Sequence, residues 1–369
     1  MLPAAPQIKS FTPRPDLPPP VGAVGAIGWL RTNLFNGGFN SVLTLLCLWL
    51  LYKVVPPISN WMILDACWVG GPEMCGQSQG ACWAFIWHKL RVLLIGTYPQ
   101  EQLWRPSLVG VIFVLLTLAT VSGRFKTRHL LPAWLFLPVL SFWLIGGGSV
   151  GLPVVDQSNW GGLMLSLGLA VVGILVSVPL GILLALGRQS STGIIKPLCV
   201  GIIEPIRGVP LVTILFMASV MIPLFLPADM QINNLLRVQI GIILFSSAYM
   251  AEVVRGGLQA IPRGQLDAAK ALGLNYWKMT LLIVLPQALR HVLPSLVGRC
   301  IALFKDTSLV IIVGLLDLLG MAKAAAQDQE WLGHNAEAYV FCALVYWCIC
   351  FSMSRYGRSL EKRGAQQTR

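Results

Sequence analysis

Eight long apolar segments, separated by short polar stretches, constrain the fold of this chain more than any other feature of its sequence. A bilayer core of ~30 Å is crossed by about 20 apolar residues in a helix, because lipid offers backbone amides no partner and a helix satisfies them internally. Charged residues make up only 11% of the chain, against ~25% in an average soluble protein. The sequence therefore predicts an all-α, polytopic membrane protein with about eight transmembrane helices. The predicted spans are 38–55, 106–122, 130–147, 161–187, 209–226, 235–254, 287–304 and 338–353.

The net charge and the cysteines indicate neither a nucleic-acid partner nor a metal site. The formal net charge is +12, but the basic residues form short clusters between the apolar segments and do not share one stripe. This distribution is typical of topology signals. The nine cysteines include no CxxC pair, and no histidine stands at metal-ligand spacing, so we expect no metal site.

Lysine and arginine predict the orientation of the chain, because basic loops stay in the cytoplasm. With the N-terminus inside, eighteen of the 27 basic residues are cytoplasmic and six are external, while Arg207, Arg299 and Lys305 lie within or beside apolar segments. Both termini are therefore expected in the cytoplasm, as tails at 1–37 and 361–369. The start of the first tail is Pro-rich and lacks a signal peptide's apolar core, which predicts disorder.

The segment 81–98 is apolar enough to resemble a further span. Its centre carries His88, Lys89 and Arg91, and such charges are costly inside a bilayer. We therefore predict an amphipathic helix at the outer surface, anchored by Trp83 and Trp87.

The external loop at 56–105 contains Cys67, Cys75 and Cys82. They allow one disulfide in an oxidising compartment, with three possible pairings, and the alternative is three ordinary small apolar residues. A run of glycines at 146–148 suggests a boundary between an N-terminal extension with three spans, 38–148, and a core with five, 149–360.

The most informative stretch is the cytoplasmic segment 256–286, which is too long and too amphipathic for a plain connection. A short helix begins at Asp267, and Gly273 can adopt the left-handed conformation that ends a helix and turns the chain. A second helix over 276–284 is expected to present Trp277, Met279, Leu282 and Ile283. Two short helices joined at a glycine predict a rigid knob outside the membrane.

This knob resembles the EAA loop of bacterial ABC import permeases, whose pattern is E-A-A, three residues, G, nine residues and I-x-L-P. The matching residues are Asp267, Ala268, Ala269, Gly273, Ile283, Leu285 and Pro286. Both spacings are kept, and the one departure is Asp267 in place of glutamate. Four flanking stretches, 161–188, 203–216, 248–265 and 303–309, look like the membrane subunits of polar amino-acid importers of the histidine and glutamate/glutamine group. The N-terminal extension and 215–227 are similar to the M-type subunit of general L-amino-acid importers.

The resemblance implies a type I importer permease core of five helices, preceded here by three, in the bacterial inner membrane. It implies four kinds of partner: a second permease, related but different; a dimer of ABC ATPases; a periplasmic amino-acid-binding protein; and a polar L-amino-acid substrate. The chain contains no GxxxxGK[ST] phosphate loop, so ATP and Mg would be bound by the ATPase. This chain would need neither a catalytic residue nor a cofactor of its own.

Charged residues inside apolar segments are candidates for the solute path. Lys305, Asp306, Thr307 and Ser308 interrupt the seventh span. A broken helix there would aim the amides of Thr307 and Ser308 at a substrate carboxylate, while Asp306 caps the helix or accepts the ammonium. The alternative is purely structural, with Asp306 as an N-cap that pairs with Lys305.

Glu204 and Arg207 are three residues apart, just before the fifth span. They form either an ion pair at the inner gate or a local structural pair. Arg299 has no evident partner, and Glu204 or Glu252 are the candidates to compensate its charge.

A second hypothesis is a stand-alone, ion-coupled secondary amino-acid transporter, which intramembrane Lys305 and Asp306 would permit. The absence of an internal repeat and the presence of the knob favour the ATP-driven importer. A membrane-embedded enzyme is a third possibility, disfavoured because no recognisable catalytic set recurs in the sequence.

Overall fold

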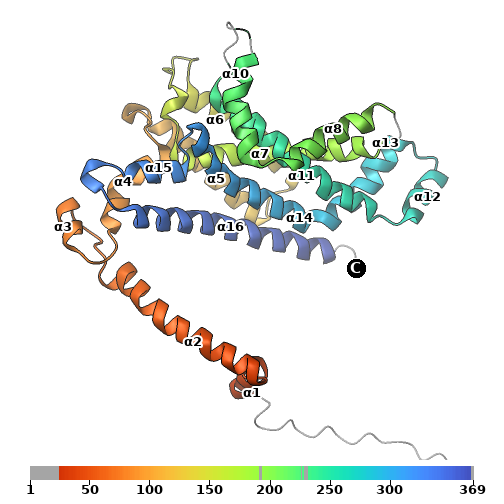
Figure 1. Ribbon diagram of the computed structural model, residues 1–369. Coiled ribbons are helices and arrows are strands. Elements are labelled where there is room, and N and C mark those ends of the chain that lie inside the picture. The colour runs from red at the N-terminus through yellow and green to blue at the C-terminus, as the bar shows by residue number, and fades with distance from the viewer. Residues whose placement is uncertain (1–24, 191–192, 226, 228–231, 367–369) are drawn as a thin grey trace, which may run out of the picture. The chain divides into compact units, whose positions relative to one another are not determined.

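A computed structural model describes residues 25–190, 193–225, 227 and 232–366 (Figure 1). Every regular element in this part of the chain is a helix, and Gly162 and Asp317 form an isolated β-bridge. The all-α prediction is therefore confirmed. The Pro-rich start that was predicted to be disordered lies outside the described residues.

The chain divides into two compact units. The first contains residues up to Cys67 together with Ser78–Ala81. It comprises α1 (Gly25–Asn33), α2 (Gly38–Ser59) and a π turn at Asn60–Leu64. No residue of α2 is buried, as expected for an apolar helix whose neighbours are lipids.

The second unit contains the remaining residues and all other helices (Figure 1). Before the glycine run they are α3 (Pro72–Gln77), α4 (Trp83–Ile95), α5 (Trp104–Ser122) and α6 (Thr127–Gly146). After it come α7 (Gly162–Arg188), α8 (Ile195–Gly208), α9 (Leu211–Phe216), α10 (Ile222–Phe225), α11 (Asn234–Gln259), α12 (Arg263–Ala271), α13 (Tyr276–Met279), α14 (Leu285–Asp306), α15 (Leu318–Ala325) and α16 (Asn335–Gln366). Figure 1 shows α12 and the C-terminal end of α16 at one end of this unit, and α3 and α4 at the other.

Six described helices are long and apolar enough to cross a membrane: Gly38–Leu64, Gln100–Ser122, Arg128–Gly146, Gly162–Arg188, Asn234–Gln259 and Asn335–Lys362. A seventh crossing results if α8 and the stretch Leu211–Phe225, which meet at a bend of 109°, count as one broken span. The eighth predicted span is α14, whose 22 residues extend over ~33 Å. It is not among these helices, and Arg290, His291 and Arg299 within it lower its mean hydropathy.

Helix α4 forms where the amphipathic segment was predicted, but it is held by protein contacts. Trp83 is buried and its ring lies 6.1 Å from that of Trp68, so the predicted anchoring by Trp83 is wrong. Trp87 is 68% exposed and remains available for the bilayer surface. The Lys89 ammonium lies 2.6 Å from Asp328, a partner that no local pattern indicates.

One of the three possible disulfides is present. Cys75 of α3 is bonded to Cys82, the residue before α4, with 5.5 Å between their Cα atoms. The bond closes the short loop between α3 and α4. Glu337 at the start of α16 accepts a hydrogen bond from the Cys82 amide at 3.0 Å, which joins this loop to the core helices.

The Lys89–Asp328 pair predicts a pH-dependent contribution to stability. The hydrogen bond from Lys89, with a second from the Glu330 amide, lowers the pKa of the Asp328 carboxyl. A carboxyl with a depressed folded-state pKa stabilises the fold above its unfolded pKa of about 3.9, and the contribution is lost as the pH falls through the folded value.

We expect Lys89→Met to lower the melting temperature in detergent at pH 7 by about 2 °C or less, and to have a smaller effect near pH 3. Lys323→Met, which removes an exposed lysine of α15, is the control. If the two variants changed the melting temperature by the same amount at both pH values, the Lys89–Asp328 pair would not be the cause.

Three apolar cores lie among the described residues of the second unit, and the smallest consists of Tyr98, Ile145, Val155 and Trp160. The other two position the site. The first core combines the C-terminal halves of α7 and α11 with α8, α12, α13 and the first part of α14. The second core combines the N-terminal halves of α7 and α11 with α9 and the end of α14. Helices α7, α11 and α14 pass through both of these cores, whereas the buried residues of α8 belong to the first and those of α9 to the second.

Candidate functional site

The predicted knob is present as α12, a tight turn and a second helix, but its first helix begins at Arg263 and not at Asp267. In α12, Asp267 and Ala268 are exposed while Ala269 is buried in the first core. The small Ala269 side chain permits the close approach of α12 to its neighbours. Ala269 therefore seats α12 on the core, and the acidic residue of the knob stays exposed for a partner.

Gly273 makes the turn as predicted. Its φ is +71°, in the left-handed region. The Gly273 amide donates to Lys270 O at 2.9 Å, and the Leu274 amide donates to Ala269 O at 3.2 Å. These two bonds define a Schellman motif, which satisfies the last carbonyls of α12. A Cβ at this position would meet no atom within 4 Å, so the backbone conformation alone requires glycine.

The second helix of the knob continues into the membrane helix. Asn275 caps α13 by accepting from the Lys278 amide at 2.9 Å, and a π segment, Thr280–Val284, joins α13 directly to α14. The Leu285 amide donates to Thr280 O in this segment. Such i→i−5 bonding adapts the helix to Pro286, which lacks an amide hydrogen.

The surface of the second helix differs from the prediction at one position. Met279 is buried in the first core, so it is not presented to a partner. Trp277 and Leu282 are 64% and 69% exposed, as predicted, and Ile283 is half-buried. With Leu272, Tyr276 and Leu281 these residues form an exposed apolar face, which we call the knob face. A group of exposed apolar side chains of this kind is typical of a protein interface.

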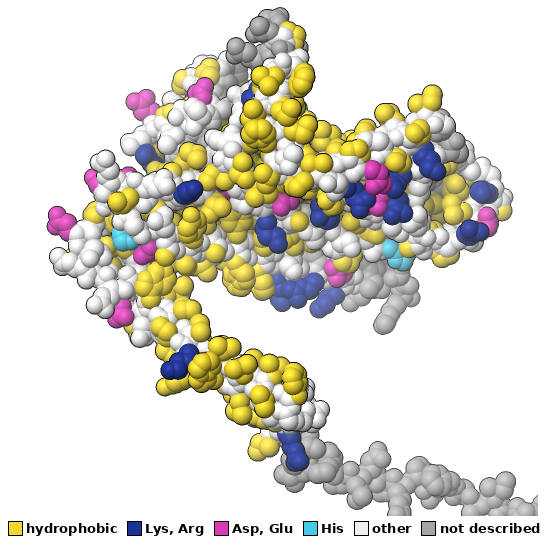
Figure 2. All heavy atoms as spheres, viewed as in Figure 1, with side chains coloured by type: hydrophobic (Ala, Val, Ile, Leu, Met, Phe, Trp, Pro, Cys, Tyr) yellow, Lys and Arg dark blue, Asp and Glu magenta, His cyan; other side chains and the backbone are white. Residues whose placement is uncertain are grey.

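A network of five charged residues lies where α7, α8 and α11 meet. Arg188 Nη1 is 2.7 Å from Glu204 Oε1 and 2.9 Å from Glu252 Oε1. Arg207 is 3.3 Å from Glu252, and Arg255 is 2.9 Å from the same carboxylate. Figure 2 shows basic and acidic side chains together over the region of α8 and α11.

The predicted Glu204–Arg207 pair is a minor contact of this network, because its two charged groups are 4.0 Å apart. The carboxylate of Glu204 faces Arg188 instead. Glu252 is the shared acceptor for Arg188, Arg207 and Arg255. The sequence spacing identified a pair, whereas the structure shows that the pair belongs to a junction of three helices.

Arg299 does not contact either of the acidic residues that were its candidate partners. Its guanidinium lies 4.2 Å from the centre of the Tyr249 ring, a cation–π contact. Arg207 lies over the same ring at 5.7 Å, and the Tyr249 hydroxyl donates to Arg207 O at 3.3 Å. Arg299 also interacts electrostatically with Asp306, seven residues further along α14.

The α-helical conformation ends within the predicted interruption at 305–308, but no free helix N-terminus forms there. Helix α14 continues to Asp306 and passes directly into a 3-10 segment, Thr307–Val313. The Thr307 amide donates to Leu303 O, and the Thr307 and Ser308 hydroxyls donate to Phe304 O and Lys305 O. Asp306 makes no capping hydrogen bond. The expectations of a free helix N-terminus and of an Asp306 N-cap are therefore wrong, and a role of these residues in the solute path stays a prediction.

Sequence reasoning missed Asp317, which is fully buried. It caps α15 by accepting from the Gly320 amide at 3.0 Å and the Leu319 amide at 3.3 Å, and it accepts from the Tyr346 hydroxyl at 3.1 Å. Ser166 of α7 accepts from the Leu318 amide beside it. An aspartate just before an apolar run is an N-cap signal that would have identified it.

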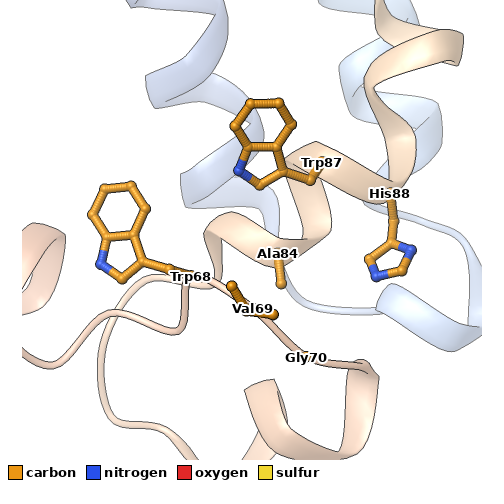
Figure 3. A pocket seen from close by; sticks show the side chains of 6 residues that line it. All are labelled: Trp68, Val69, Gly70, Ala84, Trp87 and His88. Carbon is orange, nitrogen blue, oxygen red and sulfur yellow. The ribbon is translucent and has the colours of Figure 1, made fainter.

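A shallow pocket of about 330 Å³ lies beside α4, at the end of the unit opposite the knob. It is lined by Trp68, Val69, Gly70, Ala84, Trp87 and His88. Figure 3 shows the Trp87 and His88 side chains leaving α4 in different directions. Among the described residues, no group of three or more His, Cys, Asp or Glu side chains is arranged to hold a metal ion.

Comparison with known proteins gives a family match that includes the knob. The family model described as "Binding-protein-dependent transport system inner membrane component" matches residues 177–365, the stretch that contains the charged network and the knob. The chain belongs to this family. It is therefore a polytopic membrane permease component.

Two relatives match almost the whole chain. The "Inner membrane amino-acid ABC transporter permease protein YhdY" of Escherichia coli (strain K12) is 47% identical over 358 residues, which cover 96% of this chain and 97% of YhdY. The "Glutamate/glutamine/aspartate/asparagine transport system permease protein BztC" of Rhodobacter capsulatus is 39% identical over 423 aligned positions, which cover 96% of each chain. Both matches include the N-terminal extension.

A solved structure entitled "Crystal structure of an amino acid ABC transporter with histidines" is 29% identical to this chain. The match covers 55% of this chain and 92% of that one, with a TM-score of 0.48.

Proposed function

We propose that this chain is the transmembrane permease subunit of an ATP-driven ABC importer for polar L-amino acids. The observation that carries the proposal is the knob, in which a Schellman turn at Gly273 joins two helices and displays an apolar face. The names of YhdY and BztC, an amino-acid permease and a glutamate/glutamine/aspartate/asparagine permease, support the substrate class.

The knob is the contact for an ABC ATPase dimer, which binds ATP and Mg and performs the hydrolysis. Asp267 and the knob face provide the docking surface, while Gly273, Leu285 and Pro286 set the angle between the two helices. This chain acts as a permease and not as an enzyme. A second, related permease completes the solute path, and a periplasmic binding protein delivers the amino acid.

In this proposal both chain termini lie in the cytoplasm. The C-terminal end of α16 lies at the same end of the second unit as α12 (Figure 1), which supports a cytoplasmic C-terminus on the ATPase side. The disulfide Cys75–Cys82 lies near α4 at the opposite end, where an oxidising periplasm would maintain it.

Reconstitution tests the function. The chain is combined in liposomes with its candidate partner permease, ATPase and binding protein, and uptake of radiolabelled glutamate, glutamine and histidine is measured. We expect uptake only with ATP. Uptake that persists without the ATPase, or with an ATPase that cannot hydrolyse ATP, would contradict the proposal and favour an ion-coupled transporter.

Asp306→Asn tests the proposed solute path. Asp306 is half-buried and makes no capping hydrogen bond, so loss of its charge removes no cap but weakens an acceptor for the substrate ammonium. We expect uptake to fall about fivefold or more while complex assembly, measured by gel filtration, is unchanged. Ser308→Ala, which keeps every charge, is the companion variant. Unchanged uptake by Asp306→Asn would remove Asp306 from the path.

A further inference from the structure

The α8–α9 segment is one of the elements that link the two apolar cores. Ile203 of α8 is packed in the first core, together with Ala269, Met279 and Val284 of the knob segment. Leu211 and Leu215 of α9 are packed in the second core. A movement of the knob can therefore be transmitted to α8 through the first core. From α8 it reaches α9 across the bend, through the long helices, or through Ile206, which packs against the second core.

Backbone hydrogen bonding does not fix the geometry of the bend. Val209 is extended, with φ −116° and ψ 140°, and Pro210 follows with φ −60° and ψ 145°. Proline cannot donate a backbone hydrogen bond, and it disfavours a helical conformation of the residue before it. Helical hydrogen bonding is thus interrupted between α8 and α9, so side-chain contacts must set the angle of 109°.

The charged network supplies these contacts. Arg207 lies two residues before Val209, and it is joined at 3.3 Å to Glu252 of α11, which also binds Arg188 of α7 at 2.9 Å. The Glu252 side chain is 15% exposed and that of Glu204 is 49% exposed, so water screens Glu252 less. Three arginines face two carboxylates, and without Glu252 they would repel one another.

The same carboxylate is connected to the knob. Arg255, one helical turn after Glu252, binds Glu252 through Nη2 at 2.9 Å and donates from Nη1 to Gln259 Oε1 at 2.9 Å. Gln259 is the last residue of α11, Ile261 is buried in the first core, and α12 begins at Arg263. A short, hydrogen-bonded path therefore leads from the bend to the start of the knob.

We propose that Glu252 is a positioning residue that fastens the α8–α9 bend to α11, so that movement of the knob is transmitted to α9. The inference rests on the proposed function for its transport readout. Glu252 touches neither substrate nor nucleotide in this role. It acts by holding Arg188 and Arg207 in one rigid junction.

The test replaces Glu252 with glutamine, which keeps the size of the side chain but removes the charge. In the reconstituted complex, the number of ATP molecules hydrolysed per glutamine imported is expected to rise about fivefold, with an unchanged KM for glutamine. Glu252→Asp, which keeps the charge, should recover part of the coupling. Glu204→Gln should have a smaller effect because that carboxylate is more exposed, and Glu101→Gln, an exposed residue outside the network, should have none.

Backbone hydrogen exchange over residues 205–213 provides a readout that needs no transport. We expect faster exchange there in the purified Glu252→Gln chain than in wild type, with the exchange of α16 unchanged. The faster exchange is expected even if the reconstituted wild type shows no ATP-dependent uptake. Absence of uptake would overturn the proposed function but not the role of Glu252 at the bend.

Three results would overturn the inference. Equal exchange in both chains would show that Glu252 does not stiffen the bend. A raised KM with an unchanged ratio of ATP to glutamine would make Glu252 a substrate contact. Glu252→Asp behaving like Glu252→Gln would show that charge is not the cause.

Discussion

Gly273→Val is expected to leave the chain inserted in the membrane and to reduce ATP-dependent uptake more than tenfold. The left-handed conformation at this position, φ +71°, costs a β-branched residue about 1–3 kcal/mol. Each 1.4 kcal/mol changes a population about tenfold. Because a Cβ would meet no neighbour within 4 Å, the whole effect comes from the backbone, and the Schellman hydrogen bonds to Lys270 and Ala269 are lost with it.

The measurement is co-purification of the ATPase with the variant, together with uptake in liposomes. Gly273→Asn is the first control, since asparagine adopts the left-handed region more readily than other residues with a side chain, and it should retain most of the activity. Gly110→Val is the second, because Gly110 lies within α5 and also has open space around it. Full ATPase binding by Gly273→Val would refute the assigned turn.

The second large effect is expected for Asp317→Ala, which should lower the free energy of unfolding by about 2–4 kcal/mol. Loss of an N-cap costs about 1–2 kcal/mol, and a buried amide left without a partner costs about 1–3 kcal/mol. The alanine variant would strip Gly320 and Leu319 of their acceptor in a fully buried site, and it would leave the Tyr346 hydroxyl without one of its partners.

The measurement is thermal unfolding in detergent, followed by fluorescence, combined with the yield of folded protein. Asp317→Asn keeps a side-chain oxygen that accepts from an amide, so the free energy of unfolding should fall by about half as much as in Asp317→Ala. Tyr346→Phe removes a single hydrogen bond and should cost about 1 kcal/mol. An alanine variant as stable as wild type would show that α15 does not depend on its cap.

Sequence patterns that span one or two helical turns correctly predicted the helices and the knob of this protein. The apolar segments correspond to helices, Gly273 ends α12 in the left-handed conformation, and the helix after it displays Trp277 and Leu282. These features depend on hydrogen bonds between residues three to six apart and on local hydrophobicity. Both are visible in a short window of sequence.

The partners of the charged residues were predicted poorly. Lys89 and Asp328 are separated by 239 residues, and the cation–π contact of Arg299 with Tyr249 joins α14 to α11. A free helix N-terminus was expected after Asp306, whereas the chain passes there directly from α14 into a 3-10 segment. Each outcome depends on which faces of two helices meet, and a single helical pattern carries no information about its neighbour.

The sequence by itself determined that this chain is an all-helical membrane protein with a two-helix knob, because burial in lipid and glycine's freedom at positive φ act locally. Only the tertiary structure decided that Glu252 is shared by arginines from three helices, and that Asp317 caps a buried helix. The physical reason is the cost of burying a charge. In a low-dielectric bundle each charged group must find a partner, and the packing of the helices determines which partner is within reach.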